Sequence, residues 1–209
     1  MSGGGTTRWQ QLARRGAGAD YAKTYAARFR AMAERGEDIH GEAALVTALV
    51  DPPARVLDAG CGTGRIGLRL HELGYAVVGV DVDDTMLHVA RAEAPEVDWR
   101  EADLATFDLG QRFDLVLLAG NIVPLLEPGT LAPVAARLAA HVAPGGRVVC
   151  GFGLDAAHLP AGCPVTPLAD FDDAMAAAGL EQEARFSGWD RAPFDPASGY
   201  VVAVHRPAS

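Results

Sequence analysis

A glycine-rich turn directly after a short apolar run constrains this chain more than any other feature. Residues 55–64 read RVLDAGCGTG, in which an aspartate is followed by glycines at positions 60, 62 and 64. Glycines at alternate positions let backbone amides approach a bound molecule where a Cβ would collide, and the first N–H groups of a helix attract a carboxylate or phosphate. A second apolar run, residues 76–81, also ends in a carboxylate, Asp81, which can accept hydrogen bonds from both hydroxyls of a ribose. Together the two segments predict a site for a cofactor that contains a nucleoside.

Residues 62–67 also match the GxGxxG pattern of dinucleotide-binding folds. In that pattern the first glycine follows the strand directly, whereas here residues 58–61 intervene and place the Asp58 carboxylate at the end of the strand. Asp58 would repel a pyrophosphate, but it would attract a cationic amine and a sulfonium. The turn therefore favours a cationic cofactor over a dinucleotide.

Five landmarks, in this order, resemble the class I S-adenosylmethionine-dependent methyltransferase family: residues 56–64, Asp81, and residues 101–104, 113–121 and 143–149. The resemblance covers roughly residues 45–205. It implies an S-adenosylmethionine cofactor and an α/β fold of the Rossmann-like, doubly wound type. The expected sheet is mostly parallel and seven-stranded with an antiparallel last strand, and it is preceded by an N-terminal helical extension.

The resemblance also implies site residues. Glycine backbone packs against the carboxypropyl arm of the cofactor, Asp58 supports the loop and the amine, Asp81 takes the ribose, and Asp103 accepts a hydrogen bond from the adenine amino group. In this family an N-terminal extension folds over the cofactor, so two tyrosines of that extension are added to the expected binding residues. The expected cofactor-binding residues are Asp58, Gly60, Cys61, Gly62, Gly64, Asp81, Val82, Met86, Asp103, Leu104, Ala119, Gly120, Asn121, Tyr21 and Tyr25. Met86 is equally well explained as a core residue of its helix.

Apolar periodicity gives the organisation of the chain. Strands are expected near residues 55–59, 76–81, 98–101, 115–119 and 147–152, with helices between them and Asp83 and Thr130 as N-caps. Two further strands, near residues 181–187 and 200–206, are joined by a loop without a helical pattern, so they should pair antiparallel.

Three segments are expected: a disordered or weakly ordered N-terminus over residues 1–19, a helical lid over 20–50, and the cofactor-binding domain over 51–209. The lid carries an aromatic stripe at helical spacing, which includes Tyr21 and Tyr25, and glycines 36 and 41 that are possible hinges. A helix pair packed permanently on the sheet is the alternative.

No residue is assigned as catalytic from the sequence, because a sulfonium is already activated and positioning can supply much of the catalysis. Asn121 follows the fourth strand and can contact the acceptor, the cofactor or only the loop backbone. The residues after Asn121 lack the adjacent prolines and the aromatic residue of the amino-methyltransferase tetrapeptide, which disfavours N-methylation of nucleobases or glutamine. His40 and His158 are the candidate general bases, with a solvated or structural role as the alternative for each. The loop that contains Trp189, Arg191 and Phe194 is expected to complete the acceptor pocket, unless both aromatic residues serve in packing.

Length and composition limit the function classes. A chain of 209 residues, 49% hydrophobic, suits one α/β domain, and its net charge of -9 disfavours nucleic acid as a partner. The sequence has no membrane-length apolar run, no secretion-signal pattern and no metal-ligand spacing, so a cytoplasmic protein without a metal is expected. A methyltransferase with a small-molecule acceptor is the expected function, and the oligomeric state is left open. The alternatives are a non-catalytic S-adenosylmethionine-binding scaffold and a nicotinamide-dependent oxidoreductase.

Overall fold

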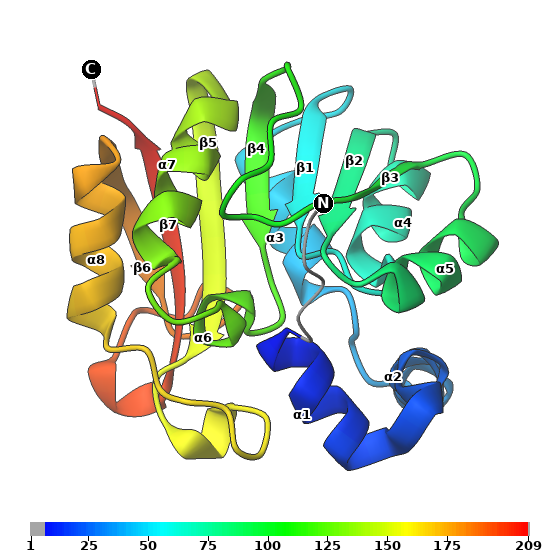
Figure 1. Ribbon diagram of the computed structural model, residues 1–209. Coiled ribbons are helices and arrows are strands. Elements are labelled where there is room, and N and C mark those ends of the chain that lie inside the picture. Colours follow the sequence, from blue (N-terminus) through cyan, green and yellow to red (C-terminus); the bar gives the residue numbers. More distant parts are fainter. Residues whose placement is uncertain (1–6, 209) are drawn as a thin grey trace.

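Seven strands form one sheet in the order β3-β2-β1-β4-β5-β7-β6 in the computed structural model, which describes residues 7–208 (Figure 1). The strands are β1 Arg55–Ala59, β2 Ala76–Asp81, β3 Asp98–Glu101, β4 Phe113–Leu118, β5 Val142–Gly153, β6 Leu180–Phe186 and β7 Tyr200–Pro207. The first five strands pair in parallel, whereas β7 runs antiparallel to both β5 and β6. The predicted sheet, including its antiparallel end, is confirmed.

Helices cover both faces of the sheet, as the alternating pattern predicts. They are α3 Gly41–Leu49, α4 Arg65–Glu72, α5 Asp84–Glu93, α6 Ile122–Leu125, α7 Leu131–His141 and α8 Leu168–Ala177. Leu138 of α7 and Phe171 of α8 belong to the core on one face, and Leu45 of α3 and Leu70 of α4 belong to the core on the other (Figure 1). Burying such a side chain contributes roughly 1.5 to 3 kcal/mol, so the apolar stripes of these helices fix their orientation on the sheet.

Two further helices, α1 Arg8–Ala17 and α2 Tyr21–Glu34, cross below the carboxyl ends of the parallel strands (Figure 1). The expectation of disorder or weak order for residues 1–19 does not hold for α1, and residues 1–6 lie outside the described part of the chain. A capping box explains the helix: the Thr7 side chain accepts a hydrogen bond from the backbone N–H of Gln10, and the Gln10 side chain accepts one from the N–H of Thr7.

The expected N-caps have different outcomes. The Asp83 side chain accepts a hydrogen bond from the Thr85 N–H at 3.0 Å and caps α5 as predicted. The Thr130 side chain does not cap α7, because its hydroxyl donates to the Glu127 carbonyl at 2.8 Å instead. Between residues 7 and 208, no helix is long and apolar enough to cross a membrane.

Candidate functional site

A cavity opens at the carboxyl ends of β1, β2 and β4, below which α1 and α2 cross. Most of the expected cofactor-binding residues line it: Asp58, Gly60, Cys61, Gly62, Asp81, Val82, Met86, Asp103, Leu104, Ala119, Gly120 and Tyr25. The cavity also has walls that the sequence did not predict, from Thr7 and Trp9 at the start of α1 and from Leu125, Leu126 and Glu127 after β4. It is therefore enclosed between the strand ends and the N-terminal segment.

Asp58 brings an unsatisfied carboxylate to this cavity. Its side chain is only 2% exposed, and Oδ2 has no hydrogen-bond partner among the described residues. Burial raises the pKa of Asp58 to about 7, against the opposing effect of the nearby Arg65 guanidinium. Because a buried oxygen without a partner is costly, a cationic donor group at this position would be stabilising.

Asp81 fastens the glycine turn to the end of β2. Its Oδ2 accepts a hydrogen bond from the Gly62 N–H at 2.8 Å, and its Oδ1 accepts one from the Asp83 N–H at 2.9 Å. Burial raises the pKa of Asp81 to about 6, and these backbone donors act in the opposite direction. A carboxylate offers about four acceptor positions, so two remain for the hydroxyls of a ligand.

The glycines of the turn have two different functions. Gly60 and Gly62 line the cavity, and a Cβ would lie 2.6 Å from Ile122 at Gly60 and 3.2 Å from Met86 at Gly62. Gly64 does not line it: a Cβ there would lie 2.8 Å from the Trp99 ring and 2.9 Å from Ala90, and its φ is +81°. Gly64 therefore meets a packing requirement, and its expected contact with the cofactor stays a prediction.

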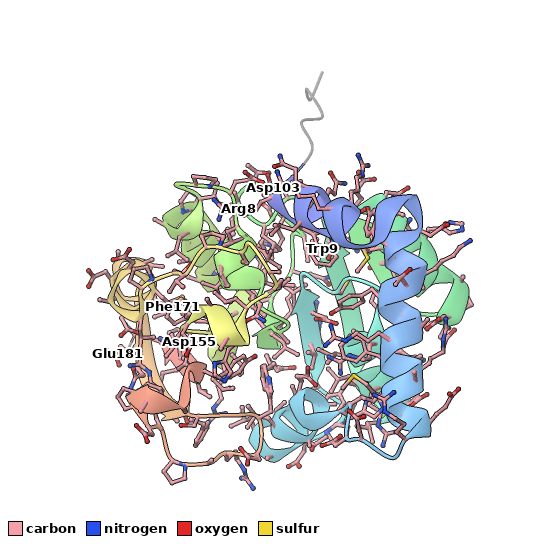
Figure 2. All side chains as sticks on the ribbon, turned by 90° about the horizontal axis from the view of Figure 1, so that it is seen from below. Arg8, Trp9, Asp103, Asp155, Phe171 and Glu181 are labelled. Carbon is pink, nitrogen blue, oxygen red and sulfur yellow. The ribbon has the colours of Figure 1, made fainter. Side chains whose placement is uncertain are left out.

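Asp103, Leu104, Val82 and Met86, the residues expected to contact adenine, all line the cavity. Figure 2 shows Asp103 and Trp9 on the same side of the molecule, and both line the cavity. Met86 is only 2% exposed and packs with Tyr21 and Ala22 of α2, so its two explanations, core residue and cavity wall, both hold.

The two tyrosines of α2 are used differently. Tyr25 lines the cavity, and its hydroxyl lies 3.9 Å from the position that a Cβ of Gly120 would occupy. Tyr21 does not line the cavity: its hydroxyl donates to Asp83 Oδ2 at 2.6 Å, and Trp9 Nε1 donates to the same oxygen at 3.1 Å. Tyr21 therefore holds the N-terminal helices against the sheet, and its expected contact with the cofactor stays a prediction.

Comparison with known proteins identifies the family to which this site belongs. A family model described as a methyltransferase domain matches residues 56–146. The chain is similar to a TehB-like SAM-dependent methyltransferase from Corynebacterium glutamicum, with 36% identity and a TM-score of 0.81 over 90% of this chain and 98% of that one. The chain belongs to the S-adenosylmethionine-dependent methyltransferase family.

Two other similar proteins have names that specify an amino sugar as the substrate. The chain is 36% identical over 120 residues to a dTDP-3-amino-3,6-dideoxy-alpha-D-glucopyranose N,N-dimethyltransferase of Streptomyces fradiae, over 55% of this chain and 47% of that protein. It is 26% identical to CalS10, an amino pentose methyltransferase from Micromonospora echinaspora, with a TM-score of 0.69 over 88% and 96% of the two chains. The chain thus spans about half the length of the curated relatives that it matches.

S-adenosylmethionine, the cofactor of the family, fits the residues of the cavity. The orphaned Oδ2 of Asp58 suits a cationic amine, and the open lone pairs of Asp81 suit a ribose. Asp103 Oδ1 accepts a hydrogen bond from the Ala105 N–H at 2.8 Å, and its other oxygen has no hydrogen-bond partner among the described residues. Membership of this family argues against the alternative function of a nicotinamide-dependent oxidoreductase.

The three candidate catalytic residues lie outside the cavity lining of this methyltransferase family member. Asn121 Oδ1 accepts a hydrogen bond from the Gly153 N–H at 2.7 Å, and its Nδ2 donates to the His158 carbonyl at 3.2 Å. Of the three roles considered for Asn121, the structure therefore shows the contact with loop backbone. The His158 ring pairs with Asp155 at 2.8 Å, and His40 directly precedes α3.

The loop between β6 and β7 contributes to packing. The Trp189 ring lies 2.1 Å from where a Cβ of Gly151 would be, so it fills the space above that glycine. Phe194 lies below the Arg185 guanidinium, with 5.4 Å from Arg185 Cζ to the ring centroid. Arg191, in the same loop, has a φ of +64°. Neither aromatic residue lines the cofactor cavity, which favours the packing explanation for both.

Sequence reasoning missed Arg65, the basic residue of the cavity wall, although it directly follows Gly64. Arg65 forms an ion pair with Glu42 at 2.6 Å, and both side chains are less than 15% exposed. Trp9 was missed together with α1. The pairing of Thr7 with Gln10 was the available signal for that helix.

Proposed function

We propose that this chain transfers the methyl group of S-adenosylmethionine to the nitrogen of a small-molecule amine. The observation that carries the proposal is the charge of the cavity wall. Four carboxylates line the cavity, those of Asp58, Asp81, Asp103 and Glu127, whereas its one basic side chain among the described residues, Arg65, is already paired with Glu42. Such a wall attracts a sulfonium and an amine and disfavours an anionic group at the position that receives the methyl group.

The chemistry of the site also favours an amine. When bound, the cofactor supplies a methyl group on an electrophile that needs no further activation. The protein must then hold and orient the reactants and exclude water, which are tasks for the glycine turn, Asp81 and the overlying Trp9 and Tyr25. Over residues 7–208, no histidine or lysine lines the cavity. An amine that this wall attracts as an ammonium first releases one proton to water. Its lone pair then attacks the methyl group, and the methylated ammonium can release a further proton to water, so an amine depends less on a protein base than an alcohol does.

The relatives support the same acceptor class, because the names of two of them specify an amino sugar as substrate. The shared region covers 47% of the Streptomyces fradiae protein, so the identity of the sugar does not carry over with it. An amino sugar, free or nucleotide-linked, is the acceptor class that we propose to test first.

The test compares pairs of acceptors that differ by one group. The protein is incubated with S-adenosylmethionine and either an amino sugar nucleotide or the same nucleotide with a hydroxyl at that carbon, and S-adenosylhomocysteine is measured. Turnover with the amine alone is expected. Turnover with only the hydroxyl compound would contradict an amine acceptor. Cofactor binding without turnover on any acceptor would favour the non-catalytic scaffold.

We also propose that the protein is located in a reducing compartment such as the cytoplasm. Cys61, Cys150 and Cys163 are all buried free thiols, and free cysteines are typical of such compartments. Burial raises the pKa of Cys150 to about 12, which keeps this thiol protonated and unreactive.

A further inference from the structure

A second groove, here called the arginine groove, lies at the end of the sheet opposite to the cofactor cavity. Its lining consists of Arg112 before β4, Ala139 of α7, Pro144, Gly145 and Arg147 of β5, Glu183 of β6, Arg206 and Pro207 of β7, and Ala208. In Figure 1, β7 ends at the upper edge of the sheet, whereas α1 and α2 cross at the lower edge. The groove has a volume of about 530 Å³, which is in the range of small-molecule sites. It shares no lining residue with the cofactor cavity and is therefore a separate candidate site.

The arginine groove collects positive charge in an acidic protein. The sequence has a net charge of -9, yet among residues 7–208 three guanidinium groups line the groove against one carboxylate, that of Glu183. Arg112 has no carboxylate partner in the described part of the chain, and its Nη1 donates to the Val142 carbonyl at 3.1 Å. Arg206 lies 3.5 Å from Glu181, and both of these side chains are more than half exposed. Such an exposed pair contributes little to stability, so Arg206 is available to another anion.

The pairing of the strands brings two of these arginines together. β5 and β7 run antiparallel with Val148 opposite His205, so the next positions, those of Arg147 and Arg206, come opposite each other. Like charges directly opposite on neighbouring strands are destabilising. Glu183 compensates for Arg147 through a bidentate pair, in which Nε donates to Oε2 and Nη2 to Oε1, both at 2.9 Å. Arg206 has no such pair, and an anion bound next to it would relieve the repulsion.

A phosphate group fits these features. A phosphate monoester carries a charge of about -1.5 to -2 at pH 7 and three strong acceptor oxygens, and guanidinium groups bind such oxygens through charge-assisted hydrogen bonds. The groove is much larger than a phosphate ion, so it has room for an attached carbon skeleton. We propose that the arginine groove binds the phosphate group of a small phosphate monoester, with Arg112 and Arg206 as its contacts. Arg147 is held in place by Glu183 as part of the wall. The proposal is independent of the proposed function.

An NMR titration of the full chain locates and measures this binding. Backbone amide signals of the nitrogen-15-labelled protein are followed while glycerol 3-phosphate is added, with sodium chloride keeping the ionic strength constant. The signals of Arg112, Gly145, Arg147 and Arg206 should shift until they saturate, and they should do so equally when S-adenosylhomocysteine is bound. Glycerol, which lacks the phosphate group, should shift none of them. Binding should weaken below about pH 6, where the monoester gains a proton and loses its second charge.

Two variants test the contacts. Arg112→Gln and Arg206→Gln should each weaken the binding of glycerol 3-phosphate roughly tenfold, because each removes a charge-assisted hydrogen bond. Both side chains are exposed, so neither substitution disturbs the core. Arg100→Gln is the matched control, since it changes the net charge by the same amount. Arg100 lies on β3, at the edge of the sheet opposite to β6, and pairs with Asp98 at 2.7 Å. This control should leave the affinity unchanged.

Several results would overturn the proposal. Equal losses in all three variants would show that general charge, and not the arginine groove, attracts the ligand. Signals that never saturate, or shifts centred on the cofactor cavity, would also contradict a site in the groove. Saturation by inorganic phosphate without saturation by glycerol 3-phosphate would rule out a phosphate ester as the ligand. None of these results bears on methyl transfer to an amine, which the comparison of acceptors tests separately.

Discussion

The Tyr21 hydroxyl donates a 2.6 Å hydrogen bond to Asp83, a fully buried carboxylate two residues after the ribose-side Asp81. The same Asp83 oxygen accepts a hydrogen bond from Trp9, and the other Asp83 oxygen caps α5. One carboxylate therefore joins α1, α2 and α5 beside the cofactor cavity. This joint connects the N-terminal helices to the binding site.

Removing the Tyr21 hydroxyl should destabilise the protein by about 1 to 3 kcal/mol, because a buried charged acceptor loses a partner. Chemical denaturation of Tyr21→Phe measures this change. Tyr75→Phe is the matched control: it loses a hydrogen bond of 2.7 Å to the Val50 carbonyl, far from the cavity. Both variants should lose stability, but only Tyr21→Phe should also loosen α1 and α2. Equal effects of the two variants on these helices would argue against the Asp83 joint.

A lid was expected over residues 20–50, but Leu45 of α3 lies in the core on the sheet, so we propose that α2 opens and closes over the cavity together with α1. A small cluster of Tyr21, Ala22 and Met86, with partly buried side chains such as that of Trp9 around it, holds these two helices. Hydrogen exchange over residues 8–34 should be faster than in β1 and should slow when S-adenosylhomocysteine binds. Slow exchange over this segment with and without ligand would instead mean that the helices are packed permanently on the sheet.

Asp81→Asn should weaken the binding of S-adenosylhomocysteine at least tenfold. The substitution alters two charge-assisted contacts with the ligand and also the hydrogen bond that Asp81 accepts from the Gly62 N–H. Asp84→Asn is the control, since Asp84 is an exposed residue paired with Arg91. Its loss should change the affinity by less than about twofold in a calorimetric titration. Asp83 is unsuitable as a control, because its replacement would remove the joint between the helices. Equal losses in the Asp81 and Asp84 variants would mean that general negative charge, not a specific contact, binds the ligand.

The stability of the ligand-free protein should fall as the pH rises from about 4 to 7. Burial raises the pKa of Asp58 from 3.8 to about 7, so in this range the folded state keeps a proton that the unfolded state has lost. A state that binds more protons is destabilised by raising the pH, here by up to about 4 kcal/mol. Urea unfolding at pH 5 and pH 8 measures the difference. Asp58→Asn should reduce it, and an unchanged pH dependence in that variant would contradict the assignment.

The strands and the glycine turn could be predicted because their signal is local. The apolar runs that end in Asp58 and Asp81 specify buried strands with carboxylates at the sheet edge, and the structure has both there. The part played by Tyr21 could not be predicted in this way. Its spacing showed that it shares a helix face with Tyr25, but its partner, Asp83, lies 62 residues further along the chain.

The same limit applies to residues whose role depends on what packs against them. Gly64 and Gly60 look equivalent in the sequence, and only the fold shows that a Cβ would meet Trp99 at Gly64 but Ile122 at Gly60. Asn121 stands where a catalytic residue would be expected, yet its amide bonds to backbone groups of Gly153 at the end of β5 and of His158 beyond it. Helix α6 spans only four residues, which is too short for a periodic pattern to reveal.

The Trp99 ring also limits which residues three positions can hold. A Cβ at Gly79 would lie 2.2 Å from this ring, and a Cβ at Gly64 or Gly67 would lie 2.8 Å from it. A side chain at any of these positions therefore requires a smaller residue at position 99 or a shift of the ring. Two of the three glycines that imitate a dinucleotide signature in this chain, Gly64 and Gly67, thus have a steric reason that is independent of any nucleotide.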